Sequence, residues 1–118
     1  GLEGLEINLP SEYDAHDFYI LPIRVKPEIL GISRDVISNA LKAEGVVGIV
    51  ERYGGLEKLR AFEDFPREDL VNADNARDRE FIGIYMCGHQ FSEAYLNQVA
   101  LVFERVWEFI PELRKGNF

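Results

Sequence analysis

The sequence is poor in cysteine and in basic residues, and each shortage excludes a class of protein. Cys87 is the single cysteine of 118 residues, so an internal disulfide is excluded and a cytoplasmic location is expected. Thirteen Lys and Arg stand against 21 Asp and Glu, which gives a formal net charge of −8. A domain of this charge repels nucleic-acid phosphates and anionic lipid surfaces, so we expect neither nucleic acid nor a membrane as a partner.

Long apolar runs and a secretory signal pattern are also missing from the sequence. The chain begins without methionine, which is compatible with processing and with an excised fragment. What the sequence does contain is 47% apolar residues, enough for the core of one domain, and residues 1–118 are expected to form a single domain. The chain has eight Phe and five Tyr, and we expect part of this aromatic surface to contact a molecule or segment outside these residues.

Three runs rich in β-branched and aromatic residues predict strands at 18–25, 46–50 and 82–86. Pro22 lacks a backbone donor, so the first strand is expected at a sheet edge or bulged there. Residues 1–17 hold turn-forming and acidic residues and are interpreted as a connector that leads into a sheet-and-helix domain over 18–118.

Capping signals predict the helices between these strands. Ser33 is a good N-cap and Gly45 a good stop, which predicts a helix over 34–44, after a loop at 26–32. Ser92 caps a long last helix that runs to about residue 110, and shorter helical stretches are expected at 56–62 and 71–81. The fold class is therefore a small α/β or α+β domain with about three strands, packed with helices.

The candidate nucleophile and metal ligands lack the arrangements that these chemistries need. Cys87 and His89 are close in sequence but have no orienting third group, and Cys87 is interpreted as a small buried residue at a strand end. Asp14, His16 and Asp17 sit together without the spacing of a metal site and are interpreted as surface residues.

Other polar groups also have simpler interpretations than catalysis. The Gly54–Gly55 pair after Arg52 and Tyr53 could cradle an anion before a short helix, but a plain turn is favoured. The acidic pairs are interpreted as solvated: Asp14/Asp17, Glu63/Asp64 and Glu68/Asp69. No lysine has the setting of a Schiff-base anchor; the four are Lys26, Lys42, Lys58 and Lys115.

A series of segments, in order along nearly the whole chain, resembles one enzyme family. Segment 16–25 reads HDFYILPIRV and is similar to the strand that opens the C-terminal domain of DegT/DnrJ/StrS-type sugar aminotransferases. Segments 31–35 and 41–46 resemble the helix and turn that follow in that family, and 84–90 resembles a later strand. Segment 96–113 resembles the final helix of that family. The chain departs from the family pattern where Gly54–Gly55 replaces a proline and Cys87–Gly88 replaces Leu-Pro.

This resemblance implies the C-terminal domain of an aspartate-aminotransferase-type enzyme that depends on pyridoxal phosphate. The large domain, which supplies the catalytic lysine, would lie outside these residues, so no cofactor is expected on this chain and no activity from it alone. The family transfers an amino group from glutamate or glutamine to a keto-sugar, often nucleotide-linked, and its members are homodimers. By position, Tyr53, His89 and the adjacent Arg52 match substrate-side segments.

Two other classes of function remain open at this point. One is a small regulatory or ligand-binding module of ferredoxin-like type, which alternating strands and helices permit. The other is an interaction domain without chemistry. The last helix bears on these alternatives, because its apolar residues form more than the single stripe that a surface helix needs. We expect the first stripe to pack on the sheet; it consists of Leu96, Val99, Phe103, Val106 and Ile110. The second stripe consists of Tyr95, Val102 and Phe109, and around Val102 and Phe109 we expect it to be exposed or covered by a neighbouring copy.

Overall fold

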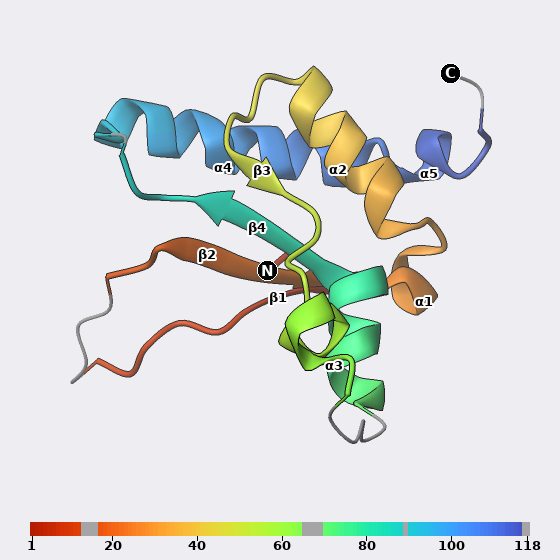
Figure 1. Ribbon diagram of the computed structural model, residues 1–118. Coiled ribbons are helices and arrows are strands. Elements are labelled where there is room, and N and C mark those ends of the chain that lie inside the picture. Colours follow the sequence, from red (N-terminus) through yellow and green to blue (C-terminus); the bar gives the residue numbers. More distant parts are fainter. Residues whose placement is uncertain (13–16, 65–69, 89, 117–118) are drawn as a thin grey trace.

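The computed structural model describes residues 1–12, 17–64, 70–88 and 90–116, in which helices lie over one side of a four-stranded sheet (Figure 1). The strands are β1 (Leu5–Ile7), β2 (Ile20–Val25), β3 (Ile49–Val50) and β4 (Phe81–Tyr85), in the spatial order β1-β2-β4-β3. All three pairings are antiparallel. The α+β class is confirmed. The ferredoxin-like alternative stays open, because β2 and β3 flank β4, each antiparallel to it, and the chain passes from β2 to β3 through the helix Arg34–Ala43, which is a split βαβ arrangement.

The N-terminal segment contributes more than a connector, and this corrects the expectation for residues 1–17. Its strand β1 pairs with β2 from Leu5 opposite Val25 to Ile7 opposite Ile23. The indole nitrogen of Trp107 also donates a 2.7 Å hydrogen bond to the carbonyl of Glu3. The sheet therefore has four strands rather than about three, because a three-residue strand carries too short an alternation to be recognised in the sequence.

Pro22 occupies an inner strand, although the sequence predicted an edge or a bulge. Strand β2 lies between β1 and β4, and Pro22 is opposite Gly83 of β4. The missing backbone donor of Pro22 is accommodated because β1 pairs with β2 only at residues 23–25. Pro22 lies just outside this paired stretch. The strand is thus an edge locally, where β1 has ended.

The predicted helices are present, with some changes in bounds. Helix α2 (Arg34–Ala43) and helix α4 (Glu93–Glu108) match the two capped helices. Residues 71–81 divide into α3 (Val71–Asn75) and a π-helical turn, η3 (Ala76–Glu80), and 56–62 into the 3-10 turns η1 (Leu56–Lys58) and η2 (Arg60–Phe62). The expected loop at 26–32 contains the short helix α1 (Pro27–Leu30), because a proline is well tolerated in the first helical turn. Helix α5 (Ile110–Leu113) follows α4.

Both ends of α2 are fixed by the residues that predicted them. The Ser33 hydroxyl accepts from the backbone N–H of Val36, as an N-cap does. At the other end Gly45, with a φ of 94°, donates to the carbonyl of Lys42 at 3.0 Å, and Val46 donates to that of Leu41 at 3.0 Å. These two bonds form a Schellman motif, which leaves the buried Val46 packed beside α2.

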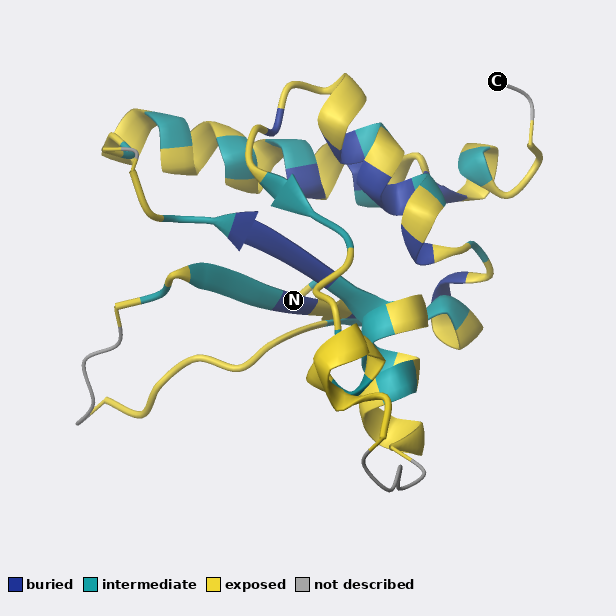
Figure 2. Cartoon of the chain, viewed as in Figure 1, coloured by how far each residue is buried: buried dark blue, intermediate teal, exposed yellow. Residues whose placement is uncertain are grey.

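The buried core lies between the sheet and the helices α2 and α4 (Figure 2). It contains eleven buried hydrophobic residues: Ile23, Val25, Leu30, Ile37, Leu41, Val46, Ile82, Ile84, Phe103, Val106 and Ile110. This is a small core for the chain. The accessible surface of 8547 Å² exceeds the roughly 6,500 Å² typical of a folded monomer of this mass. The radius of gyration of 16.0 Å likewise exceeds the expected value of about 13.5 Å.

The last helix is buried along only part of its length. Its C-terminal half packs into the core through Phe103 and Val106, but Leu96 in the same expected stripe is 45% exposed, which corrects the prediction for its N-terminal half. The expected exposure of the second stripe is confirmed at Phe109, which is 52% exposed, whereas Val102 is half-buried. Among the described residues, no helix combines the length and the apolarity that crossing a bilayer would require.

Candidate functional site

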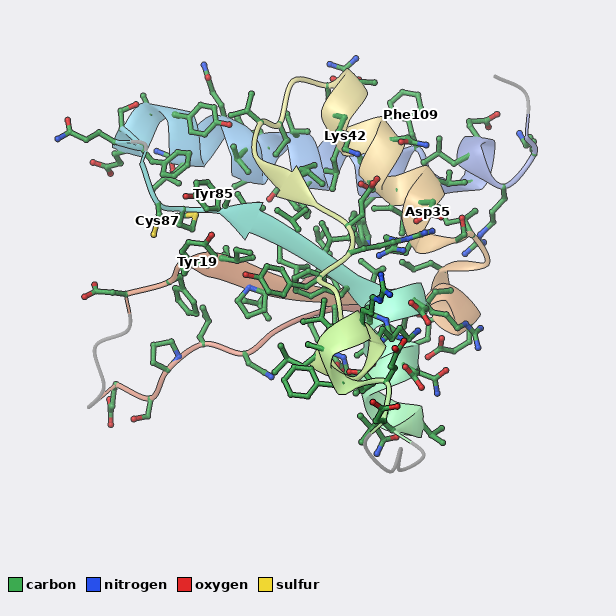
Figure 3. All side chains as sticks on the ribbon, in the orientation of Figure 1. Tyr19, Asp35, Lys42, Tyr85, Cys87 and Phe109 are labelled. Atoms are coloured by element: carbon green, nitrogen blue, oxygen red, sulfur yellow. The ribbon has the colours of Figure 1, made fainter. Side chains whose placement is uncertain are left out.

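Three tyrosines from separate segments gather beside the end of the central strands. The rings of Tyr19, just before β2, and Tyr85, the last residue of β4, meet edge to face with centroids 5.2 Å apart (Figure 3). Tyr53, in the segment after β3, is close enough for its side chain to interact with the phenol of Tyr19 by hydrogen bonding. Tyr19 and Tyr53 are 54% and 59% exposed, so this tyrosine cluster (Tyr19, Tyr53 and Tyr85) is open to a ligand.

The pairing of the strands explains why these side chains meet. Ile20 lies opposite Tyr85 in the antiparallel register, so Tyr19 is one residue beyond the paired strand end. Strand β3 is held close on the other side because the backbone N–H of Tyr85 donates to the carbonyl of Gly48 at 2.8 Å. Gly48 has a φ of 74°, and a β-carbon there would lie 3.3 Å from the carbonyl oxygen of Tyr85, so this approach favours glycine.

The electrostatics of the cluster make Tyr19 harder to ionise. The pKa of Tyr19 is raised, first because its ionised form would repel a charge on Tyr85, and second because packing removes water from its phenol. Tyr53 has a smaller effect of the opposite sign. The cluster therefore offers neutral hydroxyls and ring faces, which suit hydrogen bonding and stacking with a polar, ring-shaped ligand.

A buried arginine positions the segment that carries Tyr53. Arg34, at the start of α2, is 1% exposed, and its guanidinium donates to the backbone carbonyl of Glu51 and, at 2.8 Å, to that of Phe81. It also donates to the carbonyl of Asp78 at 3.3 Å. One side chain thus joins α2, the end of β3, the π-helical turn and the start of β4. Tyr53 follows two residues after one of these contacts.

The side chain of Glu51 is tied to α2 as well. Its carboxylate accepts from the ammonium of Lys42 at 2.7 Å and from the hydroxyl of the buried Ser38 at 2.6 Å. These two hydrogen bonds, that of Lys42 first, lower the pKa of Glu51. The chain is therefore fixed at Glu51 through both its backbone and its side chain, just before the predicted site residues begin.

The structure separates the predicted site residues. Arg52 has a side chain that is 71% exposed and approaches Asp35 of α2 at 3.8 Å, away from the tyrosine cluster. The third predicted residue, His89, lies outside the described residues, as do Asp14 and His16 of the weak metal candidate. Within the described residues, no cluster of potential ligands could hold a metal ion. Cys87 is exposed, which corrects its expected burial, because β4 ends at Tyr85 before reaching it.

The Gly54–Gly55 turn does not form an anion cradle. Gly55 precedes a single 3-10 turn, and the Glu57 carboxylate lies 2.0 Å from the position that a β-carbon on Gly55 would take. The Glu57 carboxylate, which pairs with Arg77 at 3.0 Å, therefore occupies the space at the start of the turn. The acids Glu63 and Asp64 are exposed, as expected for solvated residues, and the pair Glu68/Asp69 lies outside the described residues.

The lysines of this chain do not fit a covalent pyridoxal-phosphate site. Lys26 pairs with Glu6 at 2.7 Å, Lys42 with Glu51 at 2.7 Å and Lys115 with Glu112 at 2.7 Å. The side chain of Lys58 is 56% exposed. A Schiff-base lysine needs a desolvated or electropositive pocket, whereas these ammonium groups are paired with carboxylates or open to water.

Sequence reasoning missed Tyr19, Tyr85 and Arg34. The two tyrosines flank predicted strands, but only the register of β2 against β4 brings their rings together. Apart from the adjacent Asp35 carboxylate, the partners of Arg34 are backbone carbonyls 17 to 47 positions away, and such contacts leave no pattern in side-chain types.

The chain was also compared with known proteins. No protein-family model, curated protein or solved structure matches it.

Proposed function

We propose that this chain is the C-terminal, substrate-side domain of a pyridoxal-phosphate-dependent sugar aminotransferase of the DegT/DnrJ/StrS type. One observation carries the proposal. Three of the segments that resemble the family, the opening strand 16–25 and the substrate-side segments 52–53 and 84–90, each supply one tyrosine to the same cluster. Segments that are separate in sequence but serve one ligand are expected to converge in this way.

In this proposal the cluster contacts the keto-sugar. Tyrosine rings offer an apolar face and a hydroxyl to a sugar ring. Arg52 is directed to Asp35 and away from the cluster, so this proposal gives it no contact with the sugar ring. Because the lysines here do not fit the cofactor, the anchoring lysine belongs to the large domain, and the complete enzyme is a homodimer that takes its amino group from glutamate or glutamine.

The first test examines the full-length protein. We expect a coding sequence of a few hundred residues and a pyridoxal-phosphate aldimine that borohydride traps on a lysine outside these 118 residues. Adding glutamate without a keto-sugar should convert the cofactor to its amine form. Trapping on Lys26, Lys42, Lys58 or Lys115, or the absence of bound cofactor from the full-length protein, would refute the proposal.

The second test separates the substrate side from the rest of the enzyme. Tyr53→Phe should lower kcat/KM for the keto-sugar about two- to tenfold, the effect of losing one neutral hydrogen bond. The half-reaction with glutamate should be unchanged. Tyr95→Phe is the matched control, because Tyr95 lies on α4 and its hydroxyl accepts from the backbone N–H of Val47. His89→Ala is expected to act like Tyr53→Phe. Wild-type kinetics in both the Tyr53 and His89 variants would contradict the assignment.

A further inference from the structure

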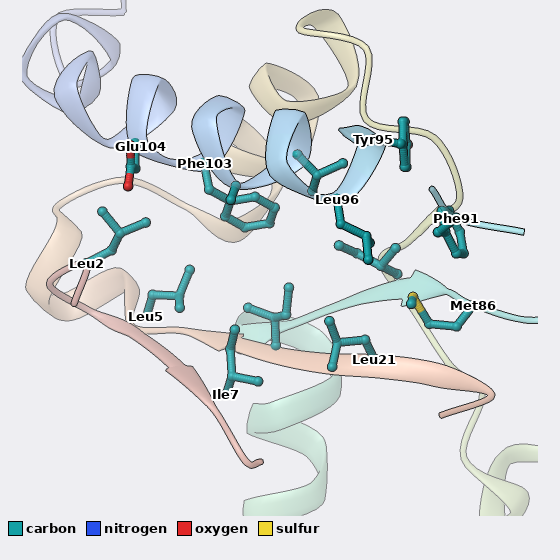
Figure 4. A pocket seen from close by; sticks show the side chains of 14 residues that line it. Leu2, Leu5, Ile7, Leu21, Met86, Phe91, Tyr95, Leu96, Phe103 and Glu104 are labelled. Carbon is teal, nitrogen blue, oxygen red and sulfur yellow. The ribbon is translucent and has the colours of Figure 1, made fainter. Parts of the chain in front are cut away.

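A second feature, outside the tyrosine cluster, is an apolar cleft of about 340 Å³ between α4 and the sheet (Figure 4). Its walls come from the N-terminal segment, β2 and β4 on one side and from α4 on the other, and almost all of the lining is hydrophobic. An enclosed apolar cavity of about 150 Å³ accommodates a benzene ring. This cleft therefore has room for about two aromatic or leucine-sized side chains.

The wall formed by α4 has the pattern of a helix that packs against another helix. Leu96, Ala100 and Phe103 line the cleft at spacings of four and three, which places them on one stripe. Leu96 is 45% exposed at one end of the stripe, whereas Phe103 is buried at the other. The small side chain of Ala100 between them leaves space for a close approach, because interhelical distance depends on the side chains at the contact.

Charge distinguishes the two ends of the cleft. Glu104 lines it near Leu2, and Glu108 lies one helical turn further along α4. Both are exposed, and neither makes an ion pair with a described residue. Arg105 of the same helix is directed to the opposite side, where it lies 3.6 Å from Glu44. The Phe103 end of the cleft is therefore negative, and a basic group on the occupant would complement it.

We propose that this cleft binds an amphipathic α-helix of a partner polypeptide, with leucine-sized residues on its apolar stripe and a Lys or Arg at the end that meets Glu104. A second copy of this chain suits the cleft poorly, because each copy carries a net charge of −8 and would bring its own carboxylates to the acidic end. The proposal is independent of the aminotransferase assignment, since it depends only on the shape and charge of the cleft.

The test uses a designed helical peptide of about 18 residues, long enough to form a helix, with a leucine stripe and Lys at one end. Isothermal titration of the chain with this peptide should show saturable one-to-one binding. A peptide with Glu in place of Lys should bind several-fold more weakly, and the difference should shrink at about 1 M salt, where charges are screened. Absence of binding by the Lys peptide, or equal binding by both peptides at low salt, would overturn the proposal.

Two matched substitutions on α4 locate the binding. Leu96→Gln, inside the cleft, should weaken the binding of the Lys peptide about five- to tenfold, because a partly buried leucine contact is lost. Leu101→Gln should leave the affinity unchanged, because Leu101 is 62% exposed on another side of the helix. Equal effects of the two substitutions would count against the cleft. So would a dimer of the chain alone that Leu96→Gln abolishes, because it would assign the cleft to a second copy.

Discussion

Replacing Arg34 with methionine should destabilise the domain more than any surface substitution. The methionine fills much of the same volume but cannot donate a hydrogen bond. The carbonyls of Glu51, Phe81 and Asp78 would then lose their donor in a region from which Arg34 excludes water. Because Glu51 directly follows β3 and Phe81 begins β4, the loss would separate α2 from the ends of β3 and β4.

The contacts of Arg34 allow the size of the effect to be worked out. A hydrogen bond from a charged donor contributes about 1.5–3 kcal/mol, and an unsatisfied buried acceptor costs about 1–3 kcal/mol. Removing the arginine also removes the cost of burying its charge, which offsets part of the loss. We therefore expect a decrease of about 3–5 kcal/mol in the free energy of unfolding. A domain of 118 residues has about 6–18 kcal/mol in total, so the loss would remove between about a sixth and most of this stability.

Urea denaturation followed by circular dichroism measures this effect, with Arg105→Met as the control. Arg105 has a side chain that is 62% exposed and a single 3.6 Å ion pair with Glu44, which contributes at most about 1 kcal/mol. The loss of stability in Arg34→Lys should lie between those of Arg34→Met and Arg105→Met, because an ammonium keeps the charge but cannot reach three carbonyls at once. A decrease below about 1 kcal/mol for Arg34→Met would show that the arginine does not join these elements.

Two further predictions concern a carboxylate and a glycine. Glu51→Gln should lower the free energy of unfolding at neutral pH by about 1 kcal/mol. The folded-state pKa of Glu51 is lowered, so the stabilisation by its carboxylate is present above the unfolded-state pKa and is lost as the pH falls through the folded-state pKa. Urea titrations of both proteins should therefore converge only once the pH has fallen below the lowered folded-state pKa of Glu51, and a constant difference across pH would contradict this. Gly83→Ala should cost about 1–3 kcal/mol, because its β-carbon would lie 2.5 Å from a methyl carbon of Ile20, whereas Gly54→Ala, with nothing within 4 Å, should change the urea midpoint little.

The parts of the fold that the sequence predicted are those with local signals. Helix α2 needed only Ser33 and Gly45, because a cap and a stop act within a few residues of themselves. Strand β1 was missed because three residues carry no measurable alternation. The position of Pro22 in an inner strand was missed because it depends on where a different strand ends.

The candidate site was less predictable, because its geometry depends on register. The family resemblance identified Tyr53, but its neighbour Tyr85 could be recognised only after β2 had been aligned with β4. Arg52 was grouped with Tyr53 by adjacency, yet successive side chains of an extended chain point to opposite sides, and Arg52 is directed to Asp35. Adjacency in sequence is therefore weak evidence for a shared site in an extended segment.

The excess surface of the chain indicates that the apolar cleft is not its only contact region. The accessible area exceeds that of a typical folded monomer by about 2,000 Å², whereas one partner in a standard interface buries about 800 Å². A single helix in the cleft would cover less than this difference. Exposed apolar residues also occur away from the cleft, at Leu56 (69%), Leu59 (49%) and Phe109 (52%). Filling the cleft alone would leave these side chains in water, so a partner that covers only α4 and β1 should raise the stability of the domain without completing its core.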